Sequence, residues 1–402
     1  MNRLTTPWGE FGLTRFPEHP RETLRAWDAA DEYLLRHLGE GEGGQEGDGG
    51  PAGPAAPAGL SGTVVVVGDR WGALTTALAG HQEREAGALV QISDSYLTQQ
   101  ATRANLRRAG LGMDAVRLLS TRDTPPERID VLLVRVPKSL AVLEDQLHRL
   151  APALHPGTLV IGTGRVTEIH TSTLKLFEQI LGPTKTSLAV KKARLIFCTP
   201  APGRVRTASP WPRSYALPEG LGSVSGRTVV NHAGIFCAER LDIGTRFLLR
   251  HLPRSRGPER VIDLGCGNGV IGTAVALDNP DATVTFIDES YAAVASAEAT
   301  FRKNVDAATP AEFVLGDSLT DVPAESADLV LTNPPFHTHQ STTDATAWRM
   351  FTGSRAALRT GGELWVIGNR HLGYHTKLRR LFGNCETVTS DPKFVILRAV
   401  KR

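Results

Sequence analysis

Short runs of apolar residues alternate along this chain with segments whose apolar positions recur every three or four residues. In the first half, residues 63–67 (TVVVV) and 130–134 (DVLLV) have the length and the β-branched content of buried strands. Residues 96–108 and 139–150 have the spacing of amphipathic helices. Further elements are expected as strands at 88–92, 158–161, 186–190 and 194–198 and as helices at 71–78 and 174–181. Buried strands that alternate with helices predict an α/β fold, in which a mostly parallel sheet carries helices on both faces.

The same alternation returns in the second half of the chain, after a stretch of different composition. Residues 201–225 are rich in proline, glycine and arginine, and we take 203–225 as a linker between two domains, residues 1–202 and 226–402. A length of 402 residues suits two domains of ordinary size. Strands of the second domain are expected at 260–264, 283–287, 312–315, 328–332, 363–367, 386–389 and 394–398.

The two halves resemble each other in sequence. ISDSYLTQQATRANL (92–106) matches FIDESYAAVASAEATF (286–301), and ALHPGTLVIG (153–162) matches ALRTGGELWVIG (357–368) with a small gap. An internal repeat of this length predicts two tandem domains of one fold.

The two copies differ where a ligand would bind. The second copy has DLGCGNGVIG at 263–272, whereas the first has VGDRWGALTT at 67–76, with fewer glycines. The first copy also has Arg135 where the second has Asn333. Close approach of a ligand to the backbone requires glycine, and a guanidinium has no hydrogen-bond acceptor to replace an amide oxygen. We therefore expect the active site in the C-terminal copy alone and a degenerate N-terminal copy.

A strand, a glycine-rich loop and a helix follow one another at VIDLGCGNGVIGTAVAL. The glycines permit a tight turn and the approach of a nucleotide-like ligand. Asp288 ends the next strand, 23 residues after Gly265, where it could accept both ribose hydroxyls. The alternatives are a ligand-free strand–helix turn and an NAD site, although the spacing GxGxGxxG differs from a plain GxGxxG. The residues assigned to this site are Asp263, Gly265, Gly267, Asn268, Gly269 and Asp288.

Asp317 follows the third strand of the second domain. It is expected either to contact the base of the same ligand or to cap the segment that follows it as a helix N-cap.

The second constellation is Asn333-Pro334-Pro335-Phe336, at the carboxyl end of the fourth strand, the edge where such sheets bind ligands. The prolines hold the backbone rigid, so that the Asn333 side-chain oxygen and the Pro334 carbonyl can point into one cleft. Two acceptors suit an exocyclic amino group with two N–H bonds, and Phe336 offers a face on which a planar group can stack. The alternative is a proline-rich turn.

Composition narrows the class of protein. Apolar residues make up 41% and charged residues 22%, no apolar run approaches the roughly 18 residues of a membrane span, and the N-terminus lacks a signal-peptide core. The four cysteines are scattered, which suggests neither disulfides nor a metal site. We expect a cytoplasmic protein without bound metal. The net charge of +3 is weak support for nucleic acid, and residues 39–59, rich in glycine and proline, are expected to be a flexible insertion.

DLGCGNG followed by NPPF resembles the class I S-adenosylmethionine methyltransferases that modify exocyclic nitrogens. The tandem arrangement with a degenerate first copy is similar to the bacterial ribosomal RNA guanine-N2 methyltransferases. The N-terminal segment 11–35, with HAGIFCAERLDIGTRFLL (232–249) and NRHLGYHTKLRRLFG (369–383), favours the 23S rRNA type over its 16S rRNA relative. The resemblance covers nearly the whole chain except the insertion, and it implies two Rossmann-like class I methyltransferase domains.

The resemblance also implies roles for the residues above. The glycine loop would line S-adenosylmethionine, Asp288 would bind its ribose and Asp317 its adenine end, and Asn333, Pro334 and Phe336 would hold a guanine. Arg370 and Lys377 would contact RNA. The N-terminal copy keeps its strands and helices but has Arg135, Val136 and Lys138 in place of the catalytic loop, so we expect it to dock the RNA, with a purely structural role as the alternative. The substrate would be 23S rRNA, naked or in an assembly particle. Two other functions stay open: methylation of a protein glutamine or of adenine N6, and a non-catalytic RNA-binding module for ribosome assembly.

Overall fold

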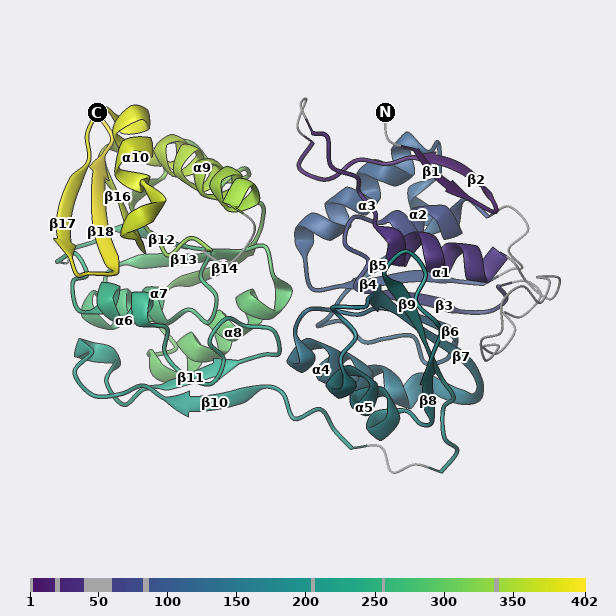
Figure 1. Ribbon diagram of the computed structural model, residues 1–402. Coiled ribbons are helices and arrows are strands. Elements are labelled where there is room, and N and C mark those ends of the chain that lie inside the picture. Colours follow the sequence, from purple (N-terminus) through teal and green to yellow (C-terminus); the bar gives the residue numbers. More distant parts are fainter. Residues whose placement is uncertain are drawn as a thin grey trace. The chain divides into compact units, whose positions relative to one another are not determined.

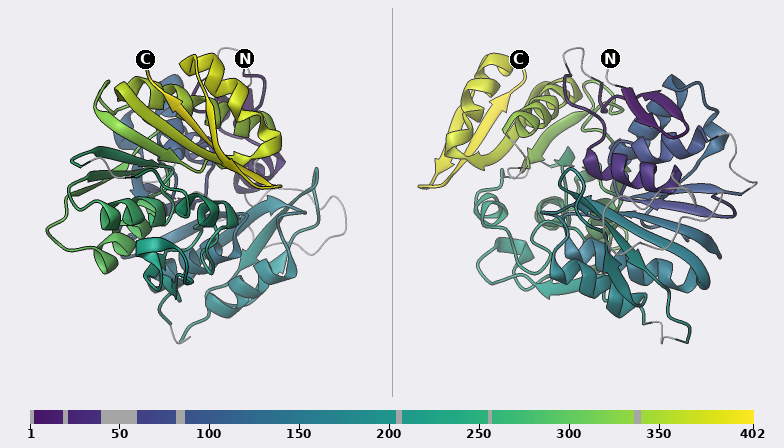
Figure 2. Two further views of the ribbon diagram at one scale, coloured as in Figure 1. Left: turned by 90° about the vertical axis from the view of Figure 1, so that its left-hand side faces the viewer. Right: turned by 45° about the vertical axis from the view of Figure 1, so that its right-hand side comes forward.

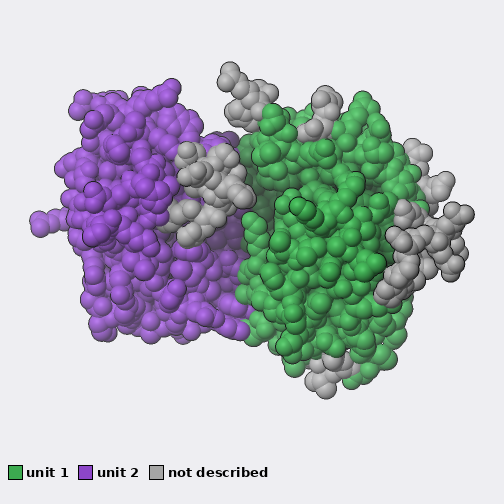
Figure 3. Space-filling model, in the orientation of Figure 1, with its two compact units in different colours: residues 1–210 green, residues 211–402 purple. Residues whose placement is uncertain are grey.

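The computed structural model describes residues 3–18, 22–39, 60–81, 87–203, 207–254, 257–335 and 340–402, with the side chains of 340–344 left aside. The predicted insertion, from residue 40 on, and Phe336 lie outside the described residues. The chain forms two compact units, residues 1–210 and 211–402 (Figure 3).

The first unit is built on a seven-stranded sheet with helices on both sides (Figure 1). Its strand order is β5-β4-β3-β6-β7-β9-β8, and all neighbours are parallel except those that involve β8 and β9. The strands are β3 (Val64–Val67), β4 (Leu89–Ser93), β5 (Arg117–Ser120), β6 (Ile129–Arg135), β7 (Leu154–Arg165), β8 (Thr184–Thr186) and β9 (Ala193–Cys198). The helices are α1 (Ala29–Gly39), α2 (Ala73–Ala79), α3 (Tyr96–Arg108), α4 (Leu140–Leu150) and α5 (Thr171–Ile180); a hairpin of β1 (Arg3–Thr6) and β2 (Gly9–Gly12) precedes them.

The central strand β3 shows why its sequence is apolar throughout. Val64 and Val66 belong to the core that α1, α2 and α3 cover, whereas Val65 and Val67 belong to the core on the other face, against α4. Every side chain of a strand that is buried on both faces lies in a core. Apolar residues therefore occupy all of its positions and do not alternate with polar ones.

The second unit repeats this architecture of a sheet packed against helices (Figure 2). Its strand order is β14-β13-β12-β15-β16-β18-β17. Its sheet consists of β12 (Arg260–Leu264), β13 (Thr283–Asp288), β14 (Ala311–Leu315), β15 (Ala327–Thr332), β16 (Leu358–Asn369), β17 (Glu386–Ser390) and β18 (Phe394–Val400). Helices α6 (Ile243–Leu249), α7 (Val270–Asp278) and α8 (Tyr291–Asn304) cover one face, and α9 (Gln340–Ala357) and α10 (Tyr374–Phe382) cover the other. The predicted α/β fold with two mostly parallel sheets is therefore confirmed.

Strand register fixes the correspondence between the copies. Val134 pairs with Val67 at the end of β3, and Thr332 pairs with Leu264 at the end of β12. The next residues along β6 and β15 are Arg135 and Asn333, which therefore occupy equivalent places in the two sheets.

Two local predictions differ from the structure. Part of the expected linker is folded: β10 (Arg213–Ala216) pairs with β11 (Thr228–Asn231), and the apolar residues that follow β10 are buried against α7. Their irregular spacing among glycines and prolines gave no periodic signal. The strand expected at 186–190 is β8, which ends at Thr186; Val190 makes a single bridge to Ala193.

Candidate active site

The carboxyl ends of the parallel strands of the second sheet bring the predicted residues to one edge. The glycine loop follows β12, Asp288 ends β13, Asp317 follows β14 and Asn333 follows β15. In an open parallel sheet this edge, where neighbouring strands diverge toward their loops, is where ligands bind.

The glycine loop depends on backbone conformations that favour glycine. Gly265, Gly267 and Gly269 have φ of 70°, 53° and 73°. A Cβ on Gly269 would lie 2.7 Å from the Ala297 Cα, so glycine is required there for packing of the loop on α8. A Cβ on Gly267 would meet nothing within 4 Å. The described atoms thus leave open space beside Gly267, as a ligand held against the backbone requires.

Two carboxylates hold the loop in place. Asp263 is buried, and its Oδ2 accepts a hydrogen bond from the Gly272 N–H at 2.9 Å in the first turn of α7. Burial raises the pKa of Asp263 to about 7. Asp288 accepts from the N–H groups of Gly267 (3.1 Å) and Ser290 (3.0 Å), and burial raises its pKa as well. Asp288 therefore contacts the glycine loop itself, whereas Asp263 contacts the first turn of the helix that follows the loop.

The remaining predicted cofactor residues have polar partners on neighbouring elements. Asn268 donates through Nδ2 to Asn231 on β11 at 3.0 Å, which ties the loop to the hairpin. Asp317 forms an ion pair with Arg349 of α9 at 3.0 Å. A turn follows Asp317, so the helix N-cap considered as an alternative is not what the structure shows.

Asn333 is held at the end of β15 by an unusual set of contacts. The Thr332 hydroxyl donates to the Leu264 carbonyl oxygen at 2.8 Å and fixes the strand end beside β12. Asn333 Nδ2 donates to Asp242 Oδ2 at 3.2 Å and to Thr245 Oγ1 at 3.0 Å, at the start of α6. Asn333 Oδ1 is buried and has no hydrogen-bond partner among the described residues. A buried acceptor without a partner is costly, which points to a ligand that donates to it.

The rest of the Asn-Pro-Pro-Phe motif is only partly described. Pro334 is buried and Pro335 is exposed, and Phe336 has no described position. On the neighbouring strand β16, Asn369 also has a buried Oδ1 without a partner among the described residues. This second acceptor was not predicted from the sequence, and neither were Asp242 and Thr245.

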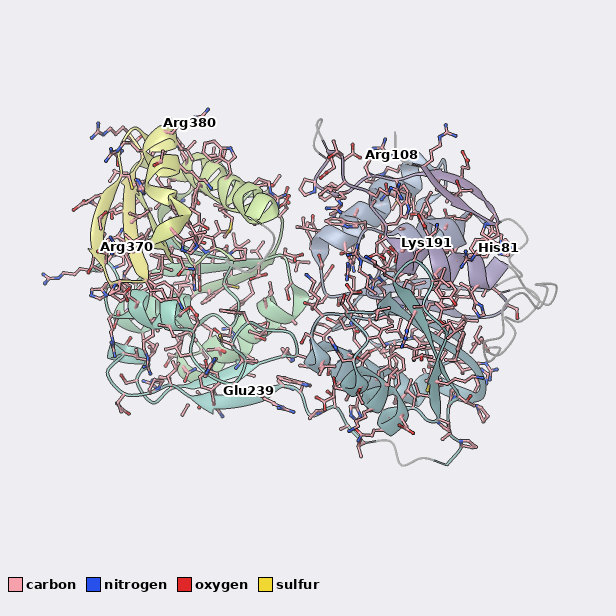
Figure 4. All side chains as sticks on the ribbon, viewed as in Figure 1. His81, Arg108, Lys191, Glu239, Arg370 and Arg380 are labelled. Atoms are coloured by element: carbon pink, nitrogen blue, oxygen red, sulfur yellow. The ribbon has the colours of Figure 1, made fainter. Side chains whose placement is uncertain are left out.

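The predicted RNA-contacting residues lie beyond the same edge. Arg370 follows β16, is exposed (Figure 4) and donates to the Asp391 carbonyl oxygen at 3.4 Å. Lys377, half-buried on α10, has its ammonium 5.5 Å from the ring centre of Tyr374.

The equivalent edge of the first unit is filled by its own side chains. Arg135 is fully buried, and its guanidinium contacts Asp28 at 2.9 Å, Glu168 at 2.7 Å and Asp31 at 3.4 Å. Gly72 and Gly269, both left-handed, are the N-caps of α2 and α7, which aligns Arg70 with Gly267. Arg70 pairs with Glu168 at 2.8 Å. The place of the acceptor amide is thus taken by an ion-pair cluster with no acceptor to offer.

Two kinds of feature are absent from the described part of the chain. No group of three or more histidine, cysteine, aspartate or glutamate side chains there is placed to hold a metal ion. None of the helices in that part combines the length and the apolar character that crossing a bilayer requires.

Comparisons with known proteins agree with this architecture. Residues 1–202 match the RLMG N-terminal domain, and residues 226–398 match the methyltransferase small domain. Ribosomal RNA large subunit methyltransferase G of Streptomyces avermitilis is 68% identical over 99% of both chains, and that of Stutzerimonas stutzeri is 46% identical over 100% of both.

One solved structure has the same fold over the whole chain. A 16S rRNA N2 methyltransferase of T. thermophilus, solved with AdoMet and guanosine, has a TM-score of 0.71 at 21% identity and covers 100% of this chain and 98% of its own. The predicted resemblance is confirmed by sequence identity over the full length of the relatives. With both domains matched in order, the chain is a methyltransferase that belongs to the ribosomal RNA large subunit methyltransferase G family.

Proposed function

We propose that the C-terminal unit transfers the methyl group of S-adenosylmethionine to the exocyclic N2 amino group of a guanine in large-subunit (23S) ribosomal RNA. The observation that carries the proposal is the buried, unpartnered Oδ1 of Asn333 beside an open glycine loop. The names of the relatives, which are large-subunit enzymes, support the RNA, and the N2 specificity of the solved 16S enzyme supports the acceptor atom. A ribosomal substrate would place the reaction in the cytoplasm.

The described residues fit S-adenosylmethionine. The space beside Gly267 would admit the ligand to the backbone, the Asp288 carboxylate would accept from the ribose hydroxyls, and Asp317 would lie at the adenine end. When bound, the cofactor supplies a methyl group on a positively charged sulfur. Asp263 and Asn268 would act indirectly, because their described contacts are to the loop and to β11.

The role of the Asn333 motif is to hold the amine. Asn333 Oδ1 and the Pro334 carbonyl oxygen would accept the two N–H bonds, so that the nitrogen lone pair faces the methyl group. Transfer would form an N–C bond as the S–C bond breaks, the electron pair of that bond would leave on the sulfur, and the nitrogen would lose one proton to water. Phe336 would stack on the base, which has to leave its own stack to reach the pocket. Positioning and exclusion of water supply the rate, without a covalent enzyme intermediate.

Asn369 favours guanine over the two other acceptors considered. Guanine presents the N1–H donor next to its amino group, whereas adenine has an acceptor at N1 and a glutamine side chain has only its amide N–H bonds. A second carbonyl oxygen on the neighbouring parallel strand matches the guanine pattern.

The test is transfer of a labelled methyl group to protein-free 23S rRNA, to protein-free 16S rRNA and to assembled large subunits, followed by nucleoside analysis. We expect N2-methylguanosine in 23S rRNA. The Asn333→Ala variant should bind the cofactor normally and lose turnover by roughly a hundredfold, because its hydrogen bond acts in the transition state. Label on adenine N6 or on protein, or near-normal single-turnover rates in the variant, would contradict the proposal.

We also propose that the N-terminal unit is an RNA-docking platform. A groove of about 510 Å³ opens between the β1–β2 hairpin, α1 and the β8–β9 turn. Two of its rings carry guanidinium groups over their faces, with Arg25 5.8 Å from Trp27 and Arg36 5.3 Å from Tyr33. Basic and aromatic side chains together suit a phosphate backbone with unpaired bases. The basic residues that line the groove are Arg3, Arg25, Arg36 and Lys191.

The turn beside the groove supports this role. Lys191 (Figure 4) and the next residue, Lys192, have φ of 47° and 64°, in the left-handed region that lysine rarely adopts. Each left-handed lysine costs free energy, of order 1 kcal/mol or more, and such strain clusters at functional sites. Glu32 is the one carboxylate among the residues that line the groove, and it pairs with Arg25 at 3.6 Å and with Lys191 at 3.5 Å. Arg3 pairs with Glu10, outside that lining.

A matched pair of variants tests the platform. Lys191→Glu should weaken RNA binding and lower the slope of affinity against salt by about one contact. The control is Lys175→Glu on α5, which is exposed and lies on the opposite face of the sheet. A chain that begins at Ser209 should still bind S-adenosylmethionine but bind RNA far more weakly. Equal affinities and salt slopes for all chains would give the N-terminal unit a purely structural role.

A further inference from the structure

The first residues of α6, the helix that precedes the catalytic sheet, make more hydrogen bonds than the start of a helix requires. Asp242 is the N-cap of α6, and its Oδ2 accepts from the Thr245 N–H at 2.8 Å and from the Thr245 hydroxyl at 3.2 Å. These two contacts are those of an ordinary N-cap. The same oxygen accepts a third hydrogen bond from Asn333, 91 residues along the chain, and Thr245 Oγ1 accepts the other N–H of that amide.

These contacts determine which way the Asn333 amide faces. An ionised carboxylate only accepts hydrogen bonds, so the group that faces Asp242 has to be the NH2 end of the amide. The Thr245 hydroxyl gives its proton to Asp242 and thus presents a lone pair to the same NH2 group. Both partners therefore direct Oδ1 away from α6, where it lies buried and unpartnered among the described residues.

The opposite orientation would defeat the reaction. An amide turned by 180° would point its NH2 group at the amino group of the base. Both groups donate hydrogen bonds, so no hydrogen bond could form between them. An amide alone has little preference between the two orientations, because its oxygen and nitrogen ends are nearly equal in shape. The preference for one orientation therefore has to come from neighbouring groups that can only accept a hydrogen bond. A carboxylate is such a group, and so is a hydroxyl whose proton is already donated elsewhere.

The degenerate N-terminal copy has equivalent contacts between the start of α1 and Arg135, so these contacts are a feature of the shared fold. WDAADEYLL (27–35) before β3 matches LDIGTRFLL (241–249) before β12, which aligns Asp28 with Asp242 and Asp31 with Thr245. Arg135, the equivalent of Asn333, is held by Asp28 at 2.9 Å and faces Asp31 at 3.4 Å. In both units a residue at the carboxyl end of the fourth strand, Arg135 or Asn333, is held by the start of the helix that precedes the sheet, α1 or α6. Only asparagine leaves an acceptor on its far side.

We propose that Asp242 and Thr245 are positioning residues for methyl transfer: they lock the Asn333 amide so that Oδ1 accepts from the amino group of the base. This inference rests on the proposed function. The residues touch Asn333 and not the reacting atoms, so their effect should pass through Asn333 alone.

The Asp242→Asn variant tests this with little disturbance of the fold, because asparagine is as good an N-cap as aspartate. Its side chain adds a donor that favours the turned amide of Asn333. We expect the single-turnover rate constant for methylation of protein-free large-subunit rRNA to fall by roughly ten- to a hundredfold, the range for loss of an oriented hydrogen bond. Cofactor affinity and thermal stability should stay at the wild-type values. Thr245→Val, which removes one acceptor, should have a smaller effect of the same kind.

The decisive measurement is a double-mutant comparison. In an Asn333→Ala background, Asp242→Asn should cause no further loss, because there is no amide left to orient. Ser139→Ala, which removes the N-cap of α4 in the other unit, serves as the control for loss of a cap and should leave methylation unchanged. A wild-type rate for Asp242→Asn, or an equal loss with and without Asn333, would overturn the positioning role. A wild-type rate for Asn333→Ala alone would instead overturn the proposed role of Asn333, and this inference with it.

Discussion

Replacing Arg135 by methionine would remove the charge around which the degenerate site of the N-terminal unit is organised. The Arg135 side chain has no exposed surface, and its three acidic partners are 11–14% exposed. Methionine has no charge and leaves Asp28, Asp31 and Glu168 facing one another. Arg70 and Arg165 remain nearby, but both are more exposed than Arg135.

Two estimates give a cost of the same order. Removing one partner of a buried ion pair destabilises proteins by about 3–5 kcal/mol. Burial by itself would raise the pKa of Glu168, yet attraction to Arg135, with hydrogen bonds from the Arg165 N–H and from Arg70, lowers it from 4.5 to about 2. A lowering of this size corresponds to about 3 kcal/mol, of which Arg135 supplies a part. We expect the variant to lose about 3 kcal/mol of stability in the N-terminal unit at neutral pH.

The loss should depend on pH. In the wild type, the depressed pKa of Glu168 gives stability that is present above pH 4.5 and lost as the pH falls toward 2. In the wild type, burial already raises the pKa of Asp31 to about 7, although attraction to Arg135 lowers it. In the variant, Asp28, Asp31 and Glu168 lack the Arg135 charge, so their folded-state pKa values all rise from those of the wild type. Their ionised forms then oppose folding, and stability falls as the pH rises. The difference between variant and wild type should therefore be larger at pH 8 than at pH 5.

Hydrogen exchange resolved by mass spectrometry can assign the loss to one unit, which a single unfolding curve of a two-domain chain cannot. The matched control is Arg165→Met, the same chemical change at a partner of Asp28 that is 57% exposed. The control should cost under about 1 kcal/mol, as surface ion pairs do. Wild-type protection of α1 and β6 in the Arg135 variant, or a loss that does not change between pH 5 and pH 8, would refute the reasoning.

The remaining predictions concern the C-terminal unit. Calorimetry should find one S-adenosylmethionine per chain, and Asp288→Ala should weaken binding by about 1.5–3 kcal/mol, the scale of a lost charged hydrogen bond; two sites, or unchanged affinity, would count against this assignment. Asp263 has a folded-state pKa raised by burial to about 7, so its contribution to stability declines as the pH rises from about 4 to 7. Asp263→Asn should remove this decline, and parallel stability curves for variant and wild type between pH 5 and pH 8 would show that the buried carboxyl does not titrate as inferred.

The fold and its duplication could be predicted from the sequence because both leave local, periodic signals. The run at β3 is apolar at every position because that strand is buried on both faces, and the pattern predicts burial without knowledge of the neighbours. The helix at Tyr96–Arg108 was predicted to the residue from its apolar spacing, which lies within one segment; the structure adds that Ser95 caps its N-terminus. The glycines were identified because they lie between a strand and a helix, and Asn333 because it lies between a strand and two prolines. Both settings imply a loop at the edge of the sheet.

Only the tertiary structure decided how the polar side chains are paired. Asp242 and Asn333 are 91 residues apart, Asp28 and Arg135 are 107 apart, and Asp317 meets Arg349 from another helix. Each of these residues is an ordinary charged or amide side chain in its own segment, and none has a period or a spacing that announces its partner. Periodicity determines which face of an element is buried. The direction of a single amide or the neutralisation of a buried guanidinium depends on atoms that the fold brings together from distant parts of the chain.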